Sequence, residues 1–314
     1  MPEIHTELDP DHLKGNGGRG RLIYLPGSAG RAREIYEHFH VQEGIHPAKR
    51  AELTSYFGRL QDGEVKVDVC ALGTGMGCPS INIVLGELIK LGGREFIRVG
   101  TAGSFREYIK VGDVVIVREA YKEEHTSRNY LPFDWPARAH PHALRAAVRA
   151  AERLGYGVSV DGHPKAHIVT AHVKDDLWEE DFPEEYRRMR NPYRRERVER
   201  IMAEAMERCE STSMEESVLY IVVEEAGIAE LVAKGRFRWE DLLEKRDGNW
   251  SARPPRTESY WSQMRYKAVA IDAIVGDREP FADPKRIKEA EEAAIRIAIQ
   301  TGLELYKQPP SGGP

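Results

Sequence analysis

The stretch LGTGMGCPSINIVLGELIKLGGREFIRVGTAGSF, residues 72–105, decides the fold. It reads as a strand end, a glycine turn, a helix, a glycine pair that stops the helix, and a strand over residues 95–100 that leads into a second glycine turn. Pro79 and Ser80 suit the start of the helix, and apolar residues then recur at helical spacing. This order predicts an α/β sheet, in which ligands bind at the carboxyl ends of the strands.

The two glycine turns of this stretch predict a site for an anion. The glycines of the first turn let backbone N–H groups approach a ligand closely, and they adopt positive φ at little cost. The strand over residues 95–100 then delivers Arg98, Thr101 and Gly103 to its carboxyl end. An arginine beside a hydroxyl group and free amides can donate several hydrogen bonds to a compact oxyanion such as phosphate.

An earlier segment repeats this chemistry. A short apolar strand over residues 21–25 leads into the loop PGSAGR and then into a helix that ends near residue 39. Gly27 opens the loop, and Arg31 stands at the helix start, where the helix dipole favours anions. Each turn alone is also compatible with an ordinary βα turn that carries a surface arginine. The occurrence of both favours their convergence on one anion.

The composition excludes several classes of protein. Of the 314 residues, 41% are hydrophobic, which is enough for a sizeable core, and the net charge of −5 gives no general affinity for nucleic acid. Cys70, Cys78 and Cys209 show neither metal-binding nor disulfide spacing. The N-terminus is too polar for a signal peptide, and no apolar run approaches the roughly 18 residues of a membrane span. We expect a cytoplasmic protein without nucleic-acid or membrane partners and without a metal.

Alternating strand and helix patterns predict a single α/β domain over residues 1–314. The candidate strands are residues 21–25, 52–60, 64–72, 95–100, 113–119, 158–160, 167–170 and 271–275, and the candidate helices are residues 31–39, 79–91, 141–154, 214–227 and 284–305. Asp62 and Gly63 form a hairpin turn signal between two of the strands. We therefore expect a central mixed β-sheet flanked by helices.

Two segments depart from this alternation. Residues 174–210 carry an acidic run and then arginine-rich runs, which predict a charged helical hairpin or flap. Acidic residues interleave the arginines, so a solvated or subunit-contacting helix is favoured over a nucleic-acid-binding one. Residues 234–267 are mostly polar but contain several aromatic residues. We expect that segment to pack on the core or on another subunit rather than to close over a substrate.

These motifs carry a resemblance to a known family. The segments concerned follow one another in the family's order and are residues 26–31, 73–80, 96–103, 111–116, 213–215 and 275–278. They resemble the signatures of the nucleoside phosphorylase-I family, which includes uridine phosphorylases, hexameric purine nucleoside phosphorylases and related nucleosidases. The N-terminal half is most similar to the uridine phosphorylases. The resemblance covers most of the chain and implies a nucleoside phosphorylase-like α/β fold.

The resemblance implies how phosphate would be held. The positions of the family's phosphate ligands are occupied by Gly27, Arg31, Arg98 and Thr101. Arg98 is also expected to take part in catalysis. The family adds an arginine from a neighbouring subunit. That position falls on Ala51 in this chain, and Arg50, one residue away, is the candidate to replace it. Inorganic phosphate would then be the co-substrate, and no cofactor is expected.

The resemblance also implies a ribose site. Met214 and Glu215 match the family's ribose-binding pair, and His5 matches a histidine that the family donates across a dimer interface. The Glu215 carboxylate can accept protons from the ribose hydroxyl groups, and its charge favours an oxocarbenium-like centre. The alternative for Glu215 is an acid that stabilises a helix N-terminus.

The base site combines features of two branches of the family. The residues expected to contact the base are Gly103, Trp178, Asp277 and Arg278. Asp277 stands where purine-cleaving members protonate or hydrogen-bond purine N7, which makes it a second catalytic candidate. Uridine-cleaving members have Asn-Arg there, whereas this chain has Asp277 followed by Arg278. Trp178 could stack on a base.

These features favour a nucleoside phosphorylase, which converts a nucleoside and phosphate reversibly to the free base and pentose 1-phosphate. It resembles uridine phosphorylases, and its base preference stays open. The alternatives on the same fold are a purine nucleoside phosphorylase, a nucleosidase and a nucleotide N-glycosidase. The alternative of another class is a non-catalytic nucleoside-binding protein. We expect a homodimer or homohexamer with shared active sites.

Overall fold

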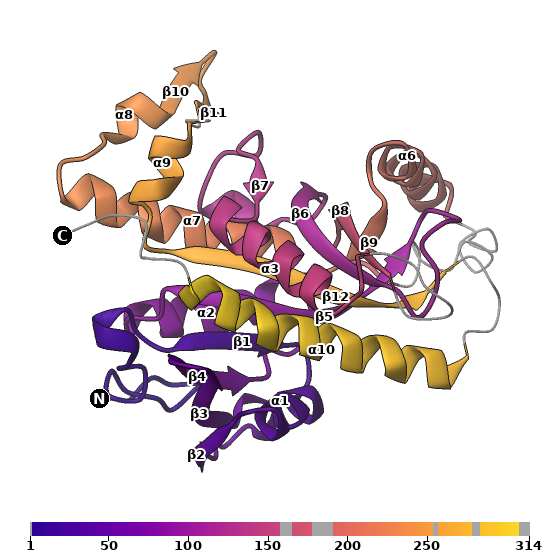
Figure 1. The fold of residues 1–314 in the computed structure, drawn as a ribbon. Helices are drawn as coiled ribbons and strands as arrows, with labels where there is room; N and C mark the ends of the chain where they lie inside the picture. Colours follow the sequence, from indigo (N-terminus) through magenta and orange to yellow (C-terminus); the bar gives the residue numbers. More distant parts are fainter. Residues whose placement is uncertain (1, 158–164, 178–190, 254–256, 278–282, 308–314) are drawn as a thin grey trace.

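The computed structural model describes residues 2–157, 165–177, 191–253, 257–277 and 283–307 (Figure 1). The strands are β1 Leu22–Pro26, β2 Val41–His46, β3 Ser55–Asp62, β4 Val65–Leu72, β5 Glu95–Ser104, β6 Val114–Lys122, β7 Ala137–Arg138, β8 Ala166–Val173, β9 Ser211–Ser213, β10 Leu243–Arg246, β11 Asn249–Ala252 and β12 Lys267–Gly276. The α-helices are α1 Ala29–Glu37, α2 Cys78–Lys90, α3 Pro141–Arg153, α6 Pro192–Arg208, α7 Glu216–Ala233, α8 Trp239–Leu242, α9 Glu258–Gln263 and α10 Pro284–Lys307. Short 3-10 helices are η1 Asn16–Gly18, η2 Ala51–Leu53 and η3 Thr126–Asn129.

One mixed sheet forms the centre of the molecule. Its strand order is β12-β6-β8-β9-β5-β1-β4-β3-β2, with β7 attached to β6. β12 also pairs with β5, so β5, β12, β6, β8 and β9 close into a ring. β1 pairs in parallel with β4 and β5, whereas β2, β3 and β4 form an antiparallel meander whose β3–β4 turn is the predicted hairpin. The predicted central mixed sheet is confirmed.

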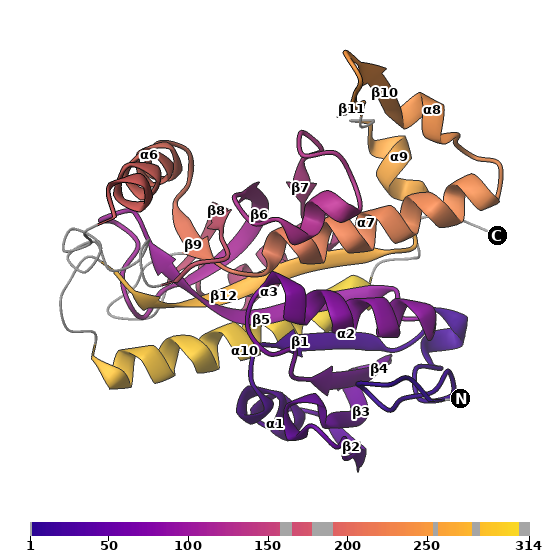
Figure 2. The same cartoon turned by 180° about the vertical axis from the view of Figure 1, so that it is seen from behind.

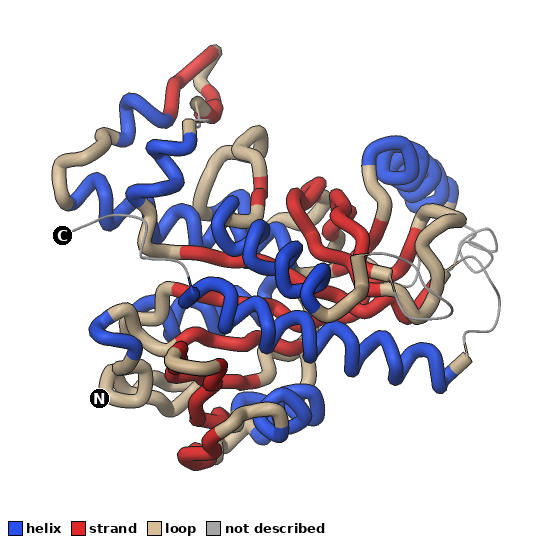
Figure 3. The backbone as a smooth tube through the Cα atoms, in the orientation of Figure 1, coloured by secondary structure: helices blue, strands red, loops and turns tan. Residues whose placement is uncertain are grey.

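Helices cover both faces of this sheet. α3 and α10 pack together on one face, where α1 also lies (Figure 1), and α2 and α7 pack together on the other (Figure 2). Figure 3 shows α3 and α10 in front of the strands in the same orientation as Figure 1. α10 turns Ala290, Ala294 and Ile297 into the core, as its amphipathic pattern predicts.

The strand that carries the second glycine motif is longer than the sequence predicts. β5 continues through Gly100 and Gly103, where we expected a turn, so that expectation is wrong. These glycines pair with β12 and β9 in extended conformation. A Cβ at Gly100 would lie 2.2 Å from Oδ1 of Asp272, and a Cβ at Gly103 would lie 3.0 Å from Cγ2 of Thr212. Here glycine permits a close approach by neighbouring side chains rather than a turn.

The charged segment contributes one described helix. α6 has buried Val198 and Met202, which pack against Phe105 at the end of β5. Its arginine-rich face points outward, as expected of a solvated or subunit-contacting helix. Residues 178–190, which would complete the predicted hairpin, lie outside the described residues.

The aromatic segment forms α8, the β10–β11 hairpin and α9, which project together from one end of the molecule (Figure 1). Tyr260 is buried and donates a hydrogen bond to Glu224 of α7 (2.8 Å), so the base of the segment packs on the core. Trp250, on the hairpin, is 62% exposed. The segment begins after the C-terminal end of α7. Along the axis of that helix, this end lies about 27 Å from the N-terminal end of α7.

The packing of α10 on β1 predicts a local stability effect. We expect Gly302→Ala to lower the free energy of unfolding by about 1–3 kcal/mol, because its Cβ would lie 2.3 Å from Oη of the buried Tyr24 and 2.7 Å from Cδ2 of Leu22. Gly86→Ala on α2 is the matched control, since no neighbouring atom of the described residues lies within 4 Å of its Cβ. The control should be neutral or stabilising by about 0.5–1 kcal/mol. Urea unfolding of both variants measures the difference, and equal effects would contradict this packing.

Candidate active site

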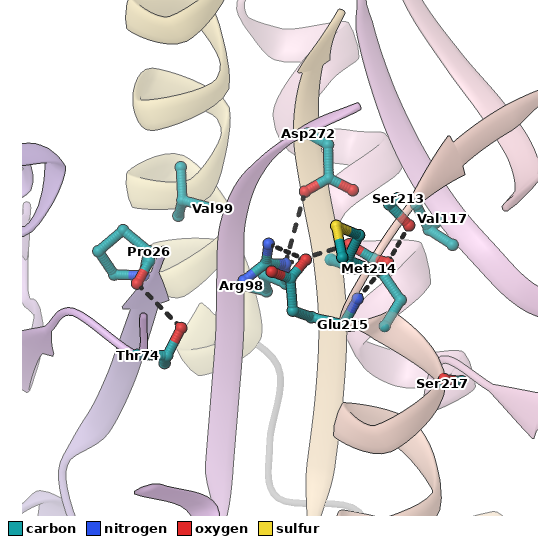
Figure 4. Close-up of polar contacts among 12 residues, drawn as sticks. Pro26, Thr74, Arg98, Val99, Val117, Ser213, Met214, Glu215, Ser217 and Asp272 are labelled. Carbon is teal, nitrogen blue, oxygen red and sulfur yellow. Dashed lines mark hydrogen bonds and ion pairs between the residues drawn. The ribbon is translucent and has the colours of Figure 1, made fainter. Parts of the chain in front are cut away.

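The glycine turn after β1 (residues 26–31) and the glycine turn after β4 (residues 73–77) lie side by side at the carboxyl ends of these strands. The N–H of Thr74 donates to the carbonyl oxygen of Pro26 (2.8 Å), and the Thr74 hydroxyl group donates to the same oxygen at 3.3 Å (Figure 4). Gly73 permits this approach, since a Cβ there would lie 3.1 Å from both the backbone N of Ala29 and the backbone C of Ser28 in the loop after β1. The two turns are therefore fixed to each other through their backbones.

The start of α1 is capped by a side chain of its own loop. The Ser28 hydroxyl group accepts a hydrogen bond from the N–H of Arg31 (3.2 Å), and half-buried Gly27 directly precedes this cap. The Arg31 guanidinium donates to the carbonyl oxygen of Val99 (3.5 Å) and forms an ion pair with Glu291 of α10. Its backbone N–H and its side chain are thus both engaged.

Arg98 of β5 is buried and surrounded by carboxyl groups. Its Nη2 donates to Glu215 (2.5 Å), its Nε donates to Glu216 (3.1 Å), and the same Nε lies 4.0 Å from Asp272. Burial lowers the pKa of Arg98, but the charges of these three neighbours outweigh burial and raise it, so the guanidinium stays charged. Nη1 is buried and donates to no described residue.

Glu215 joins Arg98 to the glycine turn after β4. One carboxylate oxygen accepts the N–H of Gly77 (2.8 Å), and the other accepts from Arg98 (Figure 4). Burial raises the pKa of Glu215; Arg98 opposes this shift and Glu216 adds to it. Half-buried Met214 precedes Glu215, and its carbonyl oxygen accepts from the thiol of Cys78 (3.1 Å). The predicted phosphate arginine and the predicted ribose carboxylate are in direct contact.

The other residues predicted around the base are only partly placed. Thr101 and Gly103 are half-buried on β5, and Gly103 lies beside Thr212, whose hydroxyl group accepts from the buried amine of Lys174. Asp277 accepts a hydrogen bond from the N–H of Val111 (2.9 Å), which ties the end of β12 to the β5–β6 loop. The remaining two, Trp178 and Arg278, lie outside the described residues.

His5 and Arg50 lie apart from the Arg98–Glu215 contact. The His5 ring lies 2.7 Å from the carboxylate of Glu87 in α2, and Arg50 is exposed directly before η2. In the described part of the chain neither forms a hydrogen bond or an ion pair with Arg98 or Glu215. Their action across a subunit interface stays a prediction.

Comparison with known proteins places this arrangement in a family. The family model described as the phosphorylase superfamily matches residues 21–232. The chain belongs to the phosphorylase superfamily. A solved purine nucleoside phosphorylase from Toxoplasma gondii, in complex with immucillin-H, superimposes with a TM-score of 0.67 over 98% of this chain and 97% of that chain, at 18% identity. That likeness confirms the predicted fold.

Curated relatives match a little under half of this superfamily member. The uridine phosphorylase of Treponema pallidum is 38% identical over 136 residues, 42% of this chain and 49% of the relative. The uridine phosphorylase of Escherichia coli is 32% identical over 152 residues, 48% of this chain and 56% of the relative. The guanosine phosphorylase of Halorubrum lacusprofundi is 32% identical over 143 residues, 46% and 57% respectively. The chain spans about half the length of the curated relatives it matches.

Two of the three acids that surround Arg98 were not predicted from the sequence. Glu216 directly follows Glu215 at the start of α7, and Asp272 is the only acid within the apolar run of β12. Both are fully buried. An acid inside a continuous apolar strand is a signal for a buried partner, because an isolated buried carboxylate is strongly unfavourable. The identity of that partner depends on which strands are neighbours.

The described residues contain neither a candidate metal site nor a candidate membrane span. No group of three or more His, Cys, Asp or Glu residues there is placed to hold a metal ion. None of the described helices combines the length and the apolar character that a membrane span requires.

The Arg98 cluster predicts a pH-dependent loss of stability. We expect Arg98→Met to lower the free energy of unfolding by on the order of 3–5 kcal/mol at neutral pH, because it leaves buried carboxyl groups without a cation. Without Arg98 these groups bind protons more tightly in the folded than in the unfolded protein, so the loss should shrink as the pH falls. Denaturant unfolding at acid and neutral pH measures both values.

Arg238→Met is the control for this prediction. Arg238 is exposed and pairs only with neighbouring Asp241 among the described residues, so its loss should change stability little at either pH. An Arg98→Met protein as stable as this control would show that the three carboxyl groups do not depend on Arg98.

Proposed function

We propose that this protein is a nucleoside phosphorylase, which uses inorganic phosphate to cleave the N-glycosidic bond of a nucleoside and releases the free base and pentose 1-phosphate. The observation that carries the proposal is the contact between Arg98 and Glu215 beside the glycine turns, in a chain of the phosphorylase superfamily. A cation for phosphate and a carboxylate for ribose must be adjacent, because phosphate attacks the anomeric carbon of the bound pentose.

In this proposal phosphate binds between Arg98 and the glycine turns. Nη1 of Arg98 is the buried donor that lacks a partner among the described residues, and it would take one phosphate oxygen. Gly27 and Thr101 would supply a backbone N–H and a hydroxyl group. Arg31 would join the site by exchanging its ion pair with Glu291 for the phosphate. Fixed donors of this kind stabilise the charge of the transition state without reorganising during the reaction.

The ribose is assigned to Met214 and Glu215. The Glu215 carboxylate would accept hydrogen bonds from the two ribose hydroxyl groups while it keeps the hydrogen bond from Arg98. Its negative charge, buried away from water, favours the positive charge that develops on the sugar as the glycosidic bond breaks. The half-buried Met214 side chain would lie against the apolar side of the sugar.

The base preference of the enzyme is proposed to resemble that of uridine phosphorylases, with altered base recognition. Relatives with uridine phosphorylase and guanosine phosphorylase names both match the chain at 32% identity or more. Gly103, Trp178, Asp277 and Arg278 are proposed to contact the base. Two further polar groups lie near Gly103, the hydroxyl group of Thr212 and the buried amine of Lys174, and they can form hydrogen bonds with the edge of the base.

A nucleosidase, which uses water in place of phosphate, is a second candidate. It is favoured by one observation: Arg31 is paired with Glu291, and Arg98 is surrounded by three carboxyl groups. The charges of these two arginines are therefore balanced within the chain. A site that activates water has no dianion to neutralise.

The proposal includes a homodimer or homohexamer in which His5 and Arg50 reach a neighbouring subunit's site. The hydrogen bond between His5 and Glu87 would orient the imidazole for that role. The cytoplasmic location stays a prediction from the sequence.

A nucleoside panel tests the proposed reaction. The purified protein is incubated with uridine, thymidine, inosine, guanosine or adenosine, with and without inorganic phosphate, and free base and pentose 1-phosphate are measured. We expect base release that requires phosphate. Glu215→Gln should lower kcat/KM by at least about 100-fold, because the neutral amide loses the charge that stabilises the transition state. Base release without phosphate would favour the nucleosidase, and no release from any nucleoside would contradict both.

Glu225→Gln is the matched control for this assay. Glu225 lies on the same helix, more than two turns from Glu215, and it should leave kcat/KM within about twofold of the parent value.

The role of Asp277 is tested by its effect on different bases. If Asp277 donates a proton to purine N7, Asp277→Asn should lower inosine or guanosine cleavage by about 10²–10⁴-fold and uridine cleavage far less. If the carboxylate serves only to anchor the N–H of Val111, the variant should change all substrates equally and lower the thermal midpoint. Comparing kcat/KM across the panel with thermal unfolding separates the two roles.

A further inference from the structure

Asp272 is a buried acid whose carboxyl group accepts no hydrogen bond from the described residues. It lies on β12 opposite Gly100, and its side chain is completely buried. In the described part of the chain, neither carboxyl oxygen receives a hydrogen bond from an N–H or O–H donor, and the Nε of Arg98 lies 4.0 Å away. A buried carboxylate in this state is costly, so the group is expected to carry a proton.

Glu216 is placed to accept a hydrogen bond from the protonated carboxyl group of Asp272. Its carboxylate already accepts from the Nε of Arg98 (3.1 Å), from the hydroxyl group of Ser213 and from the N–H of Glu215 (3.3 Å), which is the set of donors an ionised group requires. Burial raises the pKa of Asp272 well above its ordinary value, and the charge of Glu216 acts in the same direction. One proton between these two carboxyl groups completes the cluster.

We propose that Glu216 and Asp272 are positioning residues that share one proton and thereby keep Arg98 able to bind a dianionic oxyanion. This inference concerns the proton that controls the proposed phosphate site, and it rests on the proposed function. With the proton present, Arg98 faces two carboxylates, and the cluster of Arg98, Glu215, Glu216 and Asp272 carries a net charge of about −1. Without this proton the net charge of the cluster becomes about −2, and its repulsion would weaken the binding of a dianionic ligand.

The geometry explains why the pair acts through Arg98. Glu216 holds the Nε edge of the guanidinium and Glu215 holds Nη2, so the plane of the group is fixed and Nη1 is left for the ligand. Gly100 makes room for this packing, since a Cβ there would lie 3.0 Å from both Nε and Nη2 of Arg98. Neither Glu216 nor Asp272 needs to touch phosphate for its protonation to change phosphate affinity.

The titratable groups around Asp272 are few and can be named. Arg98 faces it from β5, and Glu215, Glu216 and Tyr220 face it or its carboxyl partners from α7. Cys78 of α2 lies near the two glutamates. Burial raises the pKa of the Tyr220 hydroxyl group and of the Cys78 thiol, which keeps both neutral. The proton that couples to anion binding is therefore assigned to the carboxyl pair.

The direction of the pH effect follows. Loss of the shared proton, as the pH rises through the raised pKa of Asp272, adds a negative charge beside Arg98 and weakens anion binding. Conversely, anion binding at a pH within that range draws a proton from solvent, because the bound anion stabilises the protonated pair.

Sulfate is the probe for this effect, because it remains a dianion across the working pH range whereas phosphate titrates. Isothermal titration of the parent protein with sulfate between about pH 5 and about pH 10 should show binding that weakens by at least about tenfold at the alkaline end. Titrations in two buffers of different ionisation enthalpy should show proton uptake on binding. This measurement needs no variant, so it stays decisive if a variant fails to fold.

Two variants assign the proton. Asp272→Asn mimics the protonated acid and can donate its N–H to Glu216, so it should keep sulfate affinity within about twofold at neutral pH and abolish the alkaline loss and the proton uptake. Asp272→Ala removes that donor, so KM for phosphate should rise at least about tenfold while KM for the nucleoside stays unchanged. Glu224→Gln, a buried glutamate further along α7, is the control and should leave the pH profile intact.

The outcomes separate this inference from the proposed function. Sulfate binding that is independent of pH, or an alkaline loss that survives in Asp272→Asn, would overturn the shared proton and leave phosphorolysis standing. Failure of the parent protein to bind either sulfate or phosphate at any pH would overturn both.

Discussion

Arg98 lies in the interior of the protein, and three carboxyl groups from α7 and β12 surround it. A charged guanidinium cannot be buried without partners, so β5, β12 and the start of α7 must meet around it. Glu215 extends the contact to the N–H of Gly77, which brings in the turn after β4. Four segments that are distant in the sequence are thus joined by one cation. The position of any ligand at this edge of the sheet depends on it.

Close backbone approach is the second constraint. Gly73 and Gly100 each occupy a place where a methyl group would collide with a neighbouring carbonyl or carboxyl oxygen. They allow the β1 and β4 turns to bond to each other, and Asp272 to reach the Arg98 guanidinium. Glycine-rich motifs at such an edge therefore serve the packing of charged side chains as well as the approach of a ligand.

The two arginines of the proposed phosphate site are bound by helices on opposite faces of the sheet. Arg31 is held by Glu291 of α10, and Arg98 is held by the acids at the start of α7. Each charge is balanced within the chain, so a bound anion would have to compete with carboxylates on both sides. This competition links anion binding to the protonation of buried acids, and it is the physical basis of both functional proposals.

The local patterns by themselves determined the alternation of strands and helices, the β3–β4 hairpin, the amphipathic α10 and the family, because these depend on residues that are near in sequence. The edge strand β2 and the extended path of β5 through its glycines were decided by the tertiary structure, since strand pairing overrides local turn signals there. The same holds for the site. The motifs predicted Arg98 and Glu215 as site residues, but only the pairing of β12 with β5 brings Asp272 to that arginine. A buried acid acquires its partner, its proton and its role from the strands beside it.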